Sequence, residues 1–76
     1  MIAEVEAIVM RARAVLAGHP PALQGAALAD LLAMWLAGHI VPGSASKTNA
    51  KREALLKMHV EMVCELIPVN DAQIHG

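Results

Sequence analysis

Residues 16–39 read LAGHPPALQGAALADLLAMWLAGH, and this segment holds the clearest structural signals in the chain. It begins and ends with the same four letters. Each copy contains a glycine, Gly18 or Gly38, which suits the left-handed conformation that commonly ends a helix. Pro20 or Pro21 fits the first turn of a helix, where no N–H is needed. The segment therefore predicts a helix over residues 21–37 that follows the end of an earlier one.

The predicted helix is apolar on nearly every side, with Gln24 and Asp30 as its clearly polar residues. Such a helix is either covered by other helices or spans a membrane. A span needs about 20 apolar residues, but Asp30 near its midpoint would cost about 2.5–3.5 kcal/mol. The sequence therefore favours a central buried helix over a membrane span.

Large and small side chains lie on different sides of this helix. The large residues are expected to anchor a helical core, and they are Leu28, Leu31, Leu32, Trp35 and Leu36. The small residues form an alanine row, which comprises Ala22, Ala26, Ala29 and Ala33. Small side chains let two helix axes approach closely, either within one chain or across a dimer axis. Both interpretations of the alanine row stay open.

Helical spacing of apolar residues also predicts helices over residues 2–17 and 47–67. The third helix has Ser46 or Thr48 as its N-cap and ends before Pro68. It carries two neighbouring apolar rows: Leu56, Val60, Val63 and Ile67 in one, and Leu55, His59, Met62 and Leu66 in the other. Residues 1–69 are expected to form a single helical domain, and residues 70–76 a flexible tail.

The composition indicates an all-α fold. Hydrophobic residues make up 57% of the 76 residues, yet Phe and Tyr are absent and Trp occurs once. Ala, Leu and Met, which favour helices, dominate. We expect a small three-helix bundle, or a helical hairpin plus a third helix. A chain this short covers its apolar surface poorly, so we also expect a homodimer.

The net charge and the cysteine content bear on the binding partners and on the cellular location of the protein. The formal net charge of −1 gives no general attraction to nucleic acid or to an anionic membrane. Cys64 is the only cysteine, so no disulfide can form within one chain. A single buried thiol is typical of a cytoplasmic protein, which is the location we predict.

The histidines are the main candidates for metal chemistry. His19 and His39 each follow a helix-ending glycine, and His59 lies within the third predicted helix. Zinc sites need three or four ligands at characteristic spacing, and no His-x3-His or Cys-x2-Cys pair occurs. A metal or ligand site would require histidines from two subunits, so we predict no metal and no cofactor.

Two polar groups of residues need a structural explanation. Asp30, alone on an apolar helix, is expected to make a polar contact with His59, or else with Arg11 or Arg52. Basic residues gather at the start of the third helix, and an anion could bind Ser46, Lys47, Lys51 and Arg52 there. No aromatic residue interleaves with that cluster, so stacking on nucleic-acid bases is not expected.

No catalytic motif or paired carboxylates occur in the chain. The sequence therefore predicts a self-associating interaction module or an accessory subunit that binds a copy of itself or another protein. The alternatives are a regulatory protein that binds nucleic acid or another anion through the third helix, and a small metal- or ligand-binding protein.

Overall fold

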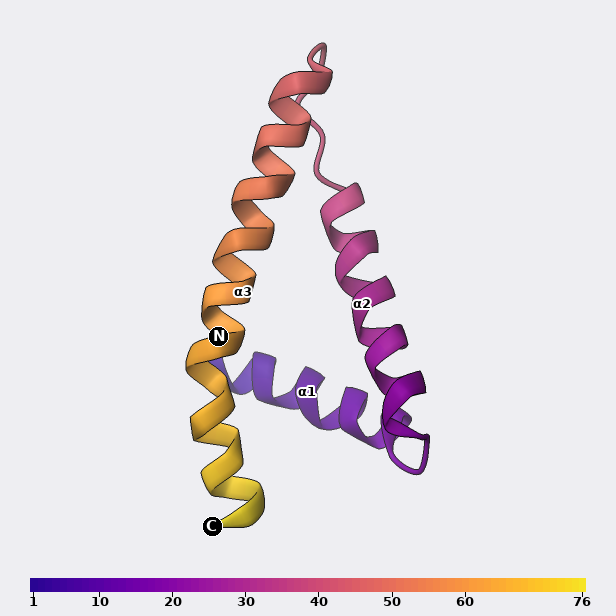
Figure 1. The fold of residues 1–76 in the computed structure, drawn as a ribbon, viewed down its shortest axis with the longest axis vertical. Helices are drawn as coiled ribbons and strands as arrows, with labels where there is room; N and C mark the ends of the chain where they lie inside the picture. Colours follow the sequence, from indigo (N-terminus) through magenta and orange to yellow (C-terminus); the bar gives the residue numbers. More distant parts are fainter. The chain divides into compact units, whose positions relative to one another are not determined.

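The computed structural model describes all 76 residues, and it is all-helical. Three helices follow one another along the chain without a strand: α1 (Ile2–Leu16), α2 (Pro21–Ala37) and α3 (Ala45–His75) (Figure 1). The predicted all-α class and the number of helices are confirmed. None of the helices combines the length and the sustained hydropathy needed to cross a bilayer.

The chain divides into two compact units, Met1–Leu31 and Leu32–Gly76, and the boundary falls within α2. The first unit contains α1 and most of α2. The second contains the end of α2, the loop after it and α3. Each unit is described by itself below, and the single domain predicted for residues 1–69 stays a prediction.

In the first unit, a short turn joins α1 to α2. Gly18 has a φ of +83°, the left-handed conformation predicted for it. The Gln24 side chain reaches back across the turn, and its Nε2 donates to the carbonyl of Leu16 at 2.8 Å. Pro21 is the first residue of α2, where its missing N–H costs nothing. The prediction that a left-handed glycine follows the end of the helix is therefore confirmed for Gly18 and α1.

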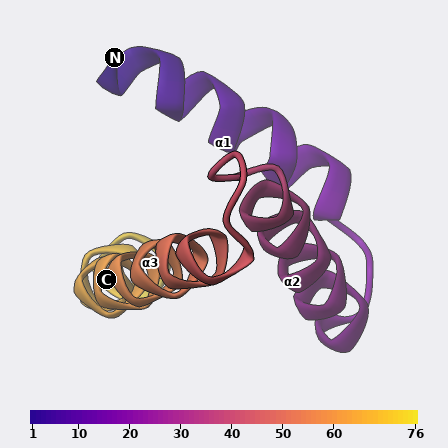
Figure 2. The ribbon, with the colours of Figure 1, turned by 90° about the horizontal axis from the view of Figure 1, so that it is seen from above.

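In the second unit, the loop after α2 leads directly into α3, as Figures 1 and 2 show from two directions. α2 ends at Ala37 as predicted. Gly38, however, does not share the positive φ of Gly18 and Gly43. A Cβ added at Gly38 would lie 3.4 Å from the carbonyl oxygen of Trp35. The two glycines of the repeated letters therefore end their helices in different ways.

α3 is longer at both ends than the sequence predicts. It begins at Ala45, and its N-cap is Ser44 rather than Ser46 or Thr48, since the Ser44 Oγ accepts from the Lys47 N–H at 3.1 Å. It continues through Pro68 to His75. The predicted end before Pro68 is therefore wrong, and the residues assigned to a flexible tail are helical.

α3 continues past Pro68 through further hydrogen-bonded turns. A proline removes one N–H from the helix, so the carbonyl of Cys64, four residues earlier, loses its helical donor. Beyond Pro68, the Asn70 side chain donates from Nδ2 to the carbonyl of Leu66 at 3.0 Å. The Gly76 N–H closes the last turn on the carbonyl of Ala72 at 2.9 Å. The helix therefore accommodates the proline without ending there.

No hydrophobic side chain is buried in the structure. Thr48, at 8% exposure, is the only buried residue of any type. The α2 residues predicted to anchor a core remain accessible: Leu28 is 52% exposed, Leu31 60% and Trp35 42%, while Leu32 and Leu36 are half-buried. Neither unit by itself buries these residues, and the apolar core that the sequence assigns to them stays a prediction. Their role at a subunit interface stays a prediction.

Candidate functional site

The Arg52 guanidinium closes the C-terminal end of α2. Its Nη2 donates to the carbonyl of Ala37 at 2.8 Å, and its Nε donates to the carbonyls of Leu36 and His39, both at 3.1 Å. The last carbonyls of a helix have no partner within the helix and carry partial negative charge. A planar guanidinium is suited to several carbonyls at once. Arg52 therefore supplies the cap that a left-handed Gly38 would otherwise have provided.

Thr48 fixes the loop between α2 and α3. Its hydroxyl oxygen accepts from the Val41 N–H at 2.9 Å and lies 2.8 Å from the carbonyl of Ser44 and 3.3 Å from that of Val41. Gly43 takes a φ of +79° in the same loop. The one buried side chain of the chain is thus polar, and its hydroxyl is satisfied by hydrogen bonds to the loop backbone.

An aromatic cluster joins α2 to α3 beside this loop. The Trp35 ring lies 4.5 Å from the His39 ring, centroid to centroid, in an edge-on arrangement, and 4.6 Å from the His59 ring. His39 and His59 are both half-buried. The chain has one Trp and no Phe or Tyr. The ring contacts of Trp35 are therefore with these two histidines.

Backbone contacts fix the protonation pattern of both imidazoles. The His39 Nδ1 lies 2.7 Å from the carbonyl of Trp35, and the His59 Nδ1 lies 3.0 Å from the carbonyl of Leu55. A carbonyl can only accept, so each Nδ1 must carry the proton and donate. In a neutral ring, Nε2 is then the free acceptor. This tautomer is the one found in metal-binding histidines, whose other nitrogen is usually held by a carbonyl or carboxylate.

Two imidazoles alone do not make a metal centre. No group of three or more His, Cys, Asp or Glu side chains lies close enough to hold a metal ion. The contacts of Arg52, Thr48 and the aromatic cluster serve to join α2 to α3.

The residues predicted to bind an anion are not brought together as a set. Ser46, Lys47 and Lys51 are exposed at the start of α3, but the Arg52 guanidinium is taken up by the α2 carbonyls. The Ser46 hydroxyl lies 3.4 Å from that of Ser44, which caps the helix. An anion at this helix start stays a prediction, and Arg52 is not part of it.

Asp30 and His59 belong to different units. Asp30 is exposed on α2 in the first unit. His59 is in the second unit, where its Nδ1 donates to its own helix and its ring contacts Trp35. A polar contact between Asp30 and His59 therefore stays a prediction. The four residues of the alanine row are likewise exposed.

The sequence identifies the residues that hold the second unit together but not the contacts they make. Trp35 and His39 are four residues apart, a spacing that places two side chains on one helix face and indicates their contact. The Arg52 cap and the hydrogen bond between Thr48 and Val41 have no local signal, because the residues they join are 7–16 positions apart along the chain. No family model, curated protein or solved structure matches the chain.

Proposed function

We propose that the chain is a self-associating helical interaction module whose folded form is a homodimer, with no catalytic role and no cofactor. The observation that carries this proposal is the absence of any buried hydrophobic residue, while large apolar side chains are exposed on all three helices. Apolar surface of this extent on a folded protein marks a site of protein association.

The exposure of side chains within one unit supports the same proposal. In the second unit, Leu56, Val60 and Val63 of α3 are 41–55% exposed. A second copy is the simplest partner because it presents the same apolar residues.

Association gives the α2 residues a role. Leu28, Leu31 and Trp35 become candidates to be covered by a partner, and the alanine row becomes a candidate for a close helix contact between subunits. The proposed location is the cytoplasm, where Cys64 would stay reduced. An accessory role toward a different protein is the second form of the same proposal, since the exposed surface would then be covered by that protein.

Light scattering on the purified chain tests the proposal. We expect a mass of twice 8.0 kDa and a cooperative thermal transition that moves to higher temperature as the protein concentration increases. A monomeric mass with a cooperative transition that is independent of concentration would contradict self-association. A monomer without a cooperative transition would instead favour the accessory role.

A further inference from the structure

The second unit uses only one of the two apolar rows of α3. Thr48, Arg52 and His59 contact the end of α2 and its loop. With Leu55 they are spaced by three or four positions, so the four residues share one face of the helix. All four are buried or half-buried. This face is partnered within the unit.

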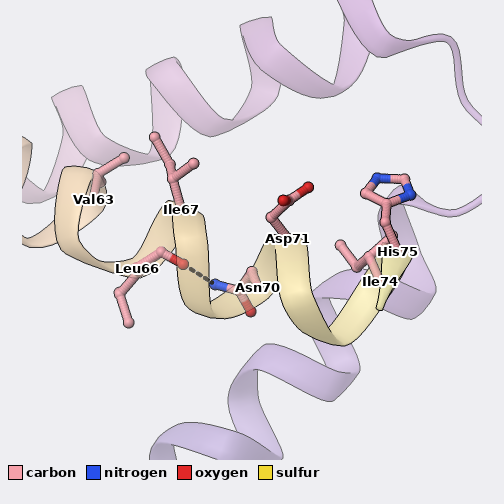
Figure 3. Close-up of a pocket in the computed structure, with 7 residues that line it drawn as sticks. All are labelled: Val63, Leu66, Ile67, Asn70, Asp71, Ile74 and His75. Atoms are coloured by element: carbon pink, nitrogen blue, oxygen red, sulfur yellow. Dashed lines mark hydrogen bonds between the residues drawn. The ribbon is translucent and has the colours of Figure 1, made fainter.

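The other row of α3 is exposed along its whole length. Its apolar members are 41–66% exposed, and they are Leu56, Val60, Val63, Ile67 and Ile74. Asn70 lies between Ile67 and Ile74. With Asn70 included, successive members of the row are separated by four and three residues in turn. We call these six residues the seam row. The side chains of Val63 and Ile67 project from the same side of α3, and that of Asp71 lies on the same side one turn further on (Figure 3).

The seam row has the spacing of a coiled coil. Steps of four and three residues keep a stripe of side chains facing one partner helix over several turns. Val60, Ile67 and Ile74 occupy one heptad position, called a, and Leu56, Val63 and Asn70 occupy the other, called d. The row extends to Ile74 because α3 continues through Pro68. Pro68 lies one position round the helix from Ile67, outside the row.

We propose that the seam row packs antiparallel against the seam row of a second copy, about a two-fold axis at Glu65. The inference rests on the proposed self-association and names the surface and geometry involved. In this arrangement every a residue faces a d residue of the second copy. Ile67 faces Val63, Val60 faces Asn70 and Ile74 faces Leu56. These pairs are all centred on residue 65.

Charge complementarity selects the antiparallel orientation. Residues beside the seam, at positions e and g, determine the orientation of paired helices. In the antiparallel pair, Lys57 faces Asp71 of the second copy, and symmetry makes this contact twice. In a parallel pair, Lys57 would instead face Arg52 of the second copy, whose guanidinium is held by the α2 carbonyls, and Asp71 would face Leu66. The antiparallel pair therefore joins opposite charges, and the parallel pair offers neither Lys57 nor Asp71 an opposite charge.

Two further residues fit the antiparallel pair. Cys64, which the sequence predicts to be buried, is exposed; in the antiparallel pair it lies beside the axis and faces Cys64 of the second copy. Asn70 is the single polar member of the seam row, and its Nδ2 already donates to the carbonyl of Leu66 at 3.0 Å. That bond reduces the cost of covering its amide. A lone polar residue in a seam also specifies the register of the pair.

The first test compares two substitutions on opposite faces of α3. Ile67→Glu places a carboxylate at the centre of the seam, and Met58→Glu makes the same kind of change on the far face. The two side chains are similarly exposed, at 60% and 56%. We expect Ile67→Glu to weaken the dimer by about 100-fold or more, because an unpaired carboxylate is costly to bury. Met58→Glu should leave the dimer unchanged.

The second test exchanges charges across the axis. Lys57→Glu alone and Asp71→Lys alone should each weaken the dimer, since each places like charges together. The double variant should recover most of the wild-type affinity. Within one chain these residues are 14 positions apart, about 21 Å along a helix, so recovery requires a contact between copies. Both side chains are exposed, and circular dichroism would verify that the helices persist.

Each outcome decides a different claim. A wild-type monomer would overturn the proposed self-association and this inference with it. A dimer that survives Ile67→Glu would overturn the seam alone and move attention to the alanine row, where Ala29→Leu would then disrupt the dimer. Loss of the dimer in Ile67→Glu without recovery in the double charge variant would overturn the antiparallel orientation. A bismaleimide reagent that links Cys64 to its copy in the native dimer only would support it.

Discussion

The Nη2 atom of Arg52 lies 2.8 Å from the carbonyl oxygen of Ala37, the last residue of α2. With the Nε bonds to Leu36 and His39, this contact ends α2 and attaches it to α3. In place of a glycine turn, a side chain 15 residues further along the chain completes the helix end. The geometry of the second unit therefore depends on one guanidinium.

Substitution of Arg52 tests this dependence. Arg52→Ala removes three hydrogen bonds from a charged donor, and hydrogen bonds to charged groups contribute about 1.5–3 kcal/mol each when removed singly. Because the side chain is only half-buried, we expect the free energy of unfolding to fall by about 2 kcal/mol in total. Urea titration at a fixed chain concentration would measure the change.

Two matched variants control for charge. Lys51→Ala removes a neighbouring exposed cation and should change stability by no more than about 0.5 kcal/mol. Arg52→Lys should recover only part of the loss, since an ammonium cannot reproduce the planar fork. Equal effects of Arg52→Ala and Lys51→Ala would mean that the three bonds do not stabilise the unit.

The Thr48 hydroxyl supports a second prediction. Thr48→Val keeps the shape of the side chain but leaves the Val41 N–H without the acceptor that lies 2.9 Å away. An unsatisfied buried donor costs about 1–3 kcal/mol, and Thr48 is the one buried side chain. We expect a lower Tm for Thr48→Val and a smaller loss for Thr48→Ser, which keeps the hydroxyl. A stable Thr48→Val variant would show that packing, not hydrogen bonding, fixes the loop.

Gly18 and Gly25 should respond to alanine with opposite signs. Nothing lies within 4 Å of a Cβ at either position. Gly18 has a φ of +83°, so Gly18→Ala should destabilise by about 1 kcal/mol through backbone strain. Gly25 lies inside α2, where Gly25→Ala should stabilise by about 0.5–1 kcal/mol through helix propensity. Thermal melts of the two variants would show opposite shifts.

Gly25 lies one turn from Ala22 and from Ala29, on the side of the alanine row. A loss of stability in Gly25→Ala would mean that the added methyl meets another chain at this face. That result would favour the alanine row over the seam row as the subunit contact.

Trp35 fluorescence reports the contact between α2 and α3. The chain has one tryptophan, and its ring lies 4.6 Å from that of His59. His59→Ala should increase the exposure of the indole, shift its emission to longer wavelength and lower stability by about 0.5–1.5 kcal/mol, the usual value of an aromatic pair. His19→Ala, in the first unit, is the control. Identical spectra for His59→Ala and the wild type would refute the contact.

The helices were predictable where local signals act alone. Pro21 and Gly18 mark the turn between α1 and α2, and both behave as local chemistry predicts. Gly38 was misleading because Arg52, a distant residue, took over its role. Pro68 was misleading because a proline disfavours the helical turn before it without always ending the helix, and α3 continues to His75.

The candidate site was less predictable than the helices. The sequence identifies His39 and His59 as residues of interest, but their contact with Trp35 depends on how α2 meets α3. Neither unit by itself buries an apolar core, for a related reason. A helical pattern shows which side chains should be covered, and it does not show whether the same chain or a second copy covers them.

Sedimentation equilibrium over a range of concentrations shows whether a second copy covers the exposed apolar surface. We expect a mass of twice 8.0 kDa for the wild type and dissociation toward the single-chain mass for Ile67→Glu at the same concentrations. A single-chain mass for a fully helical wild type at every concentration would refute the proposed dimer.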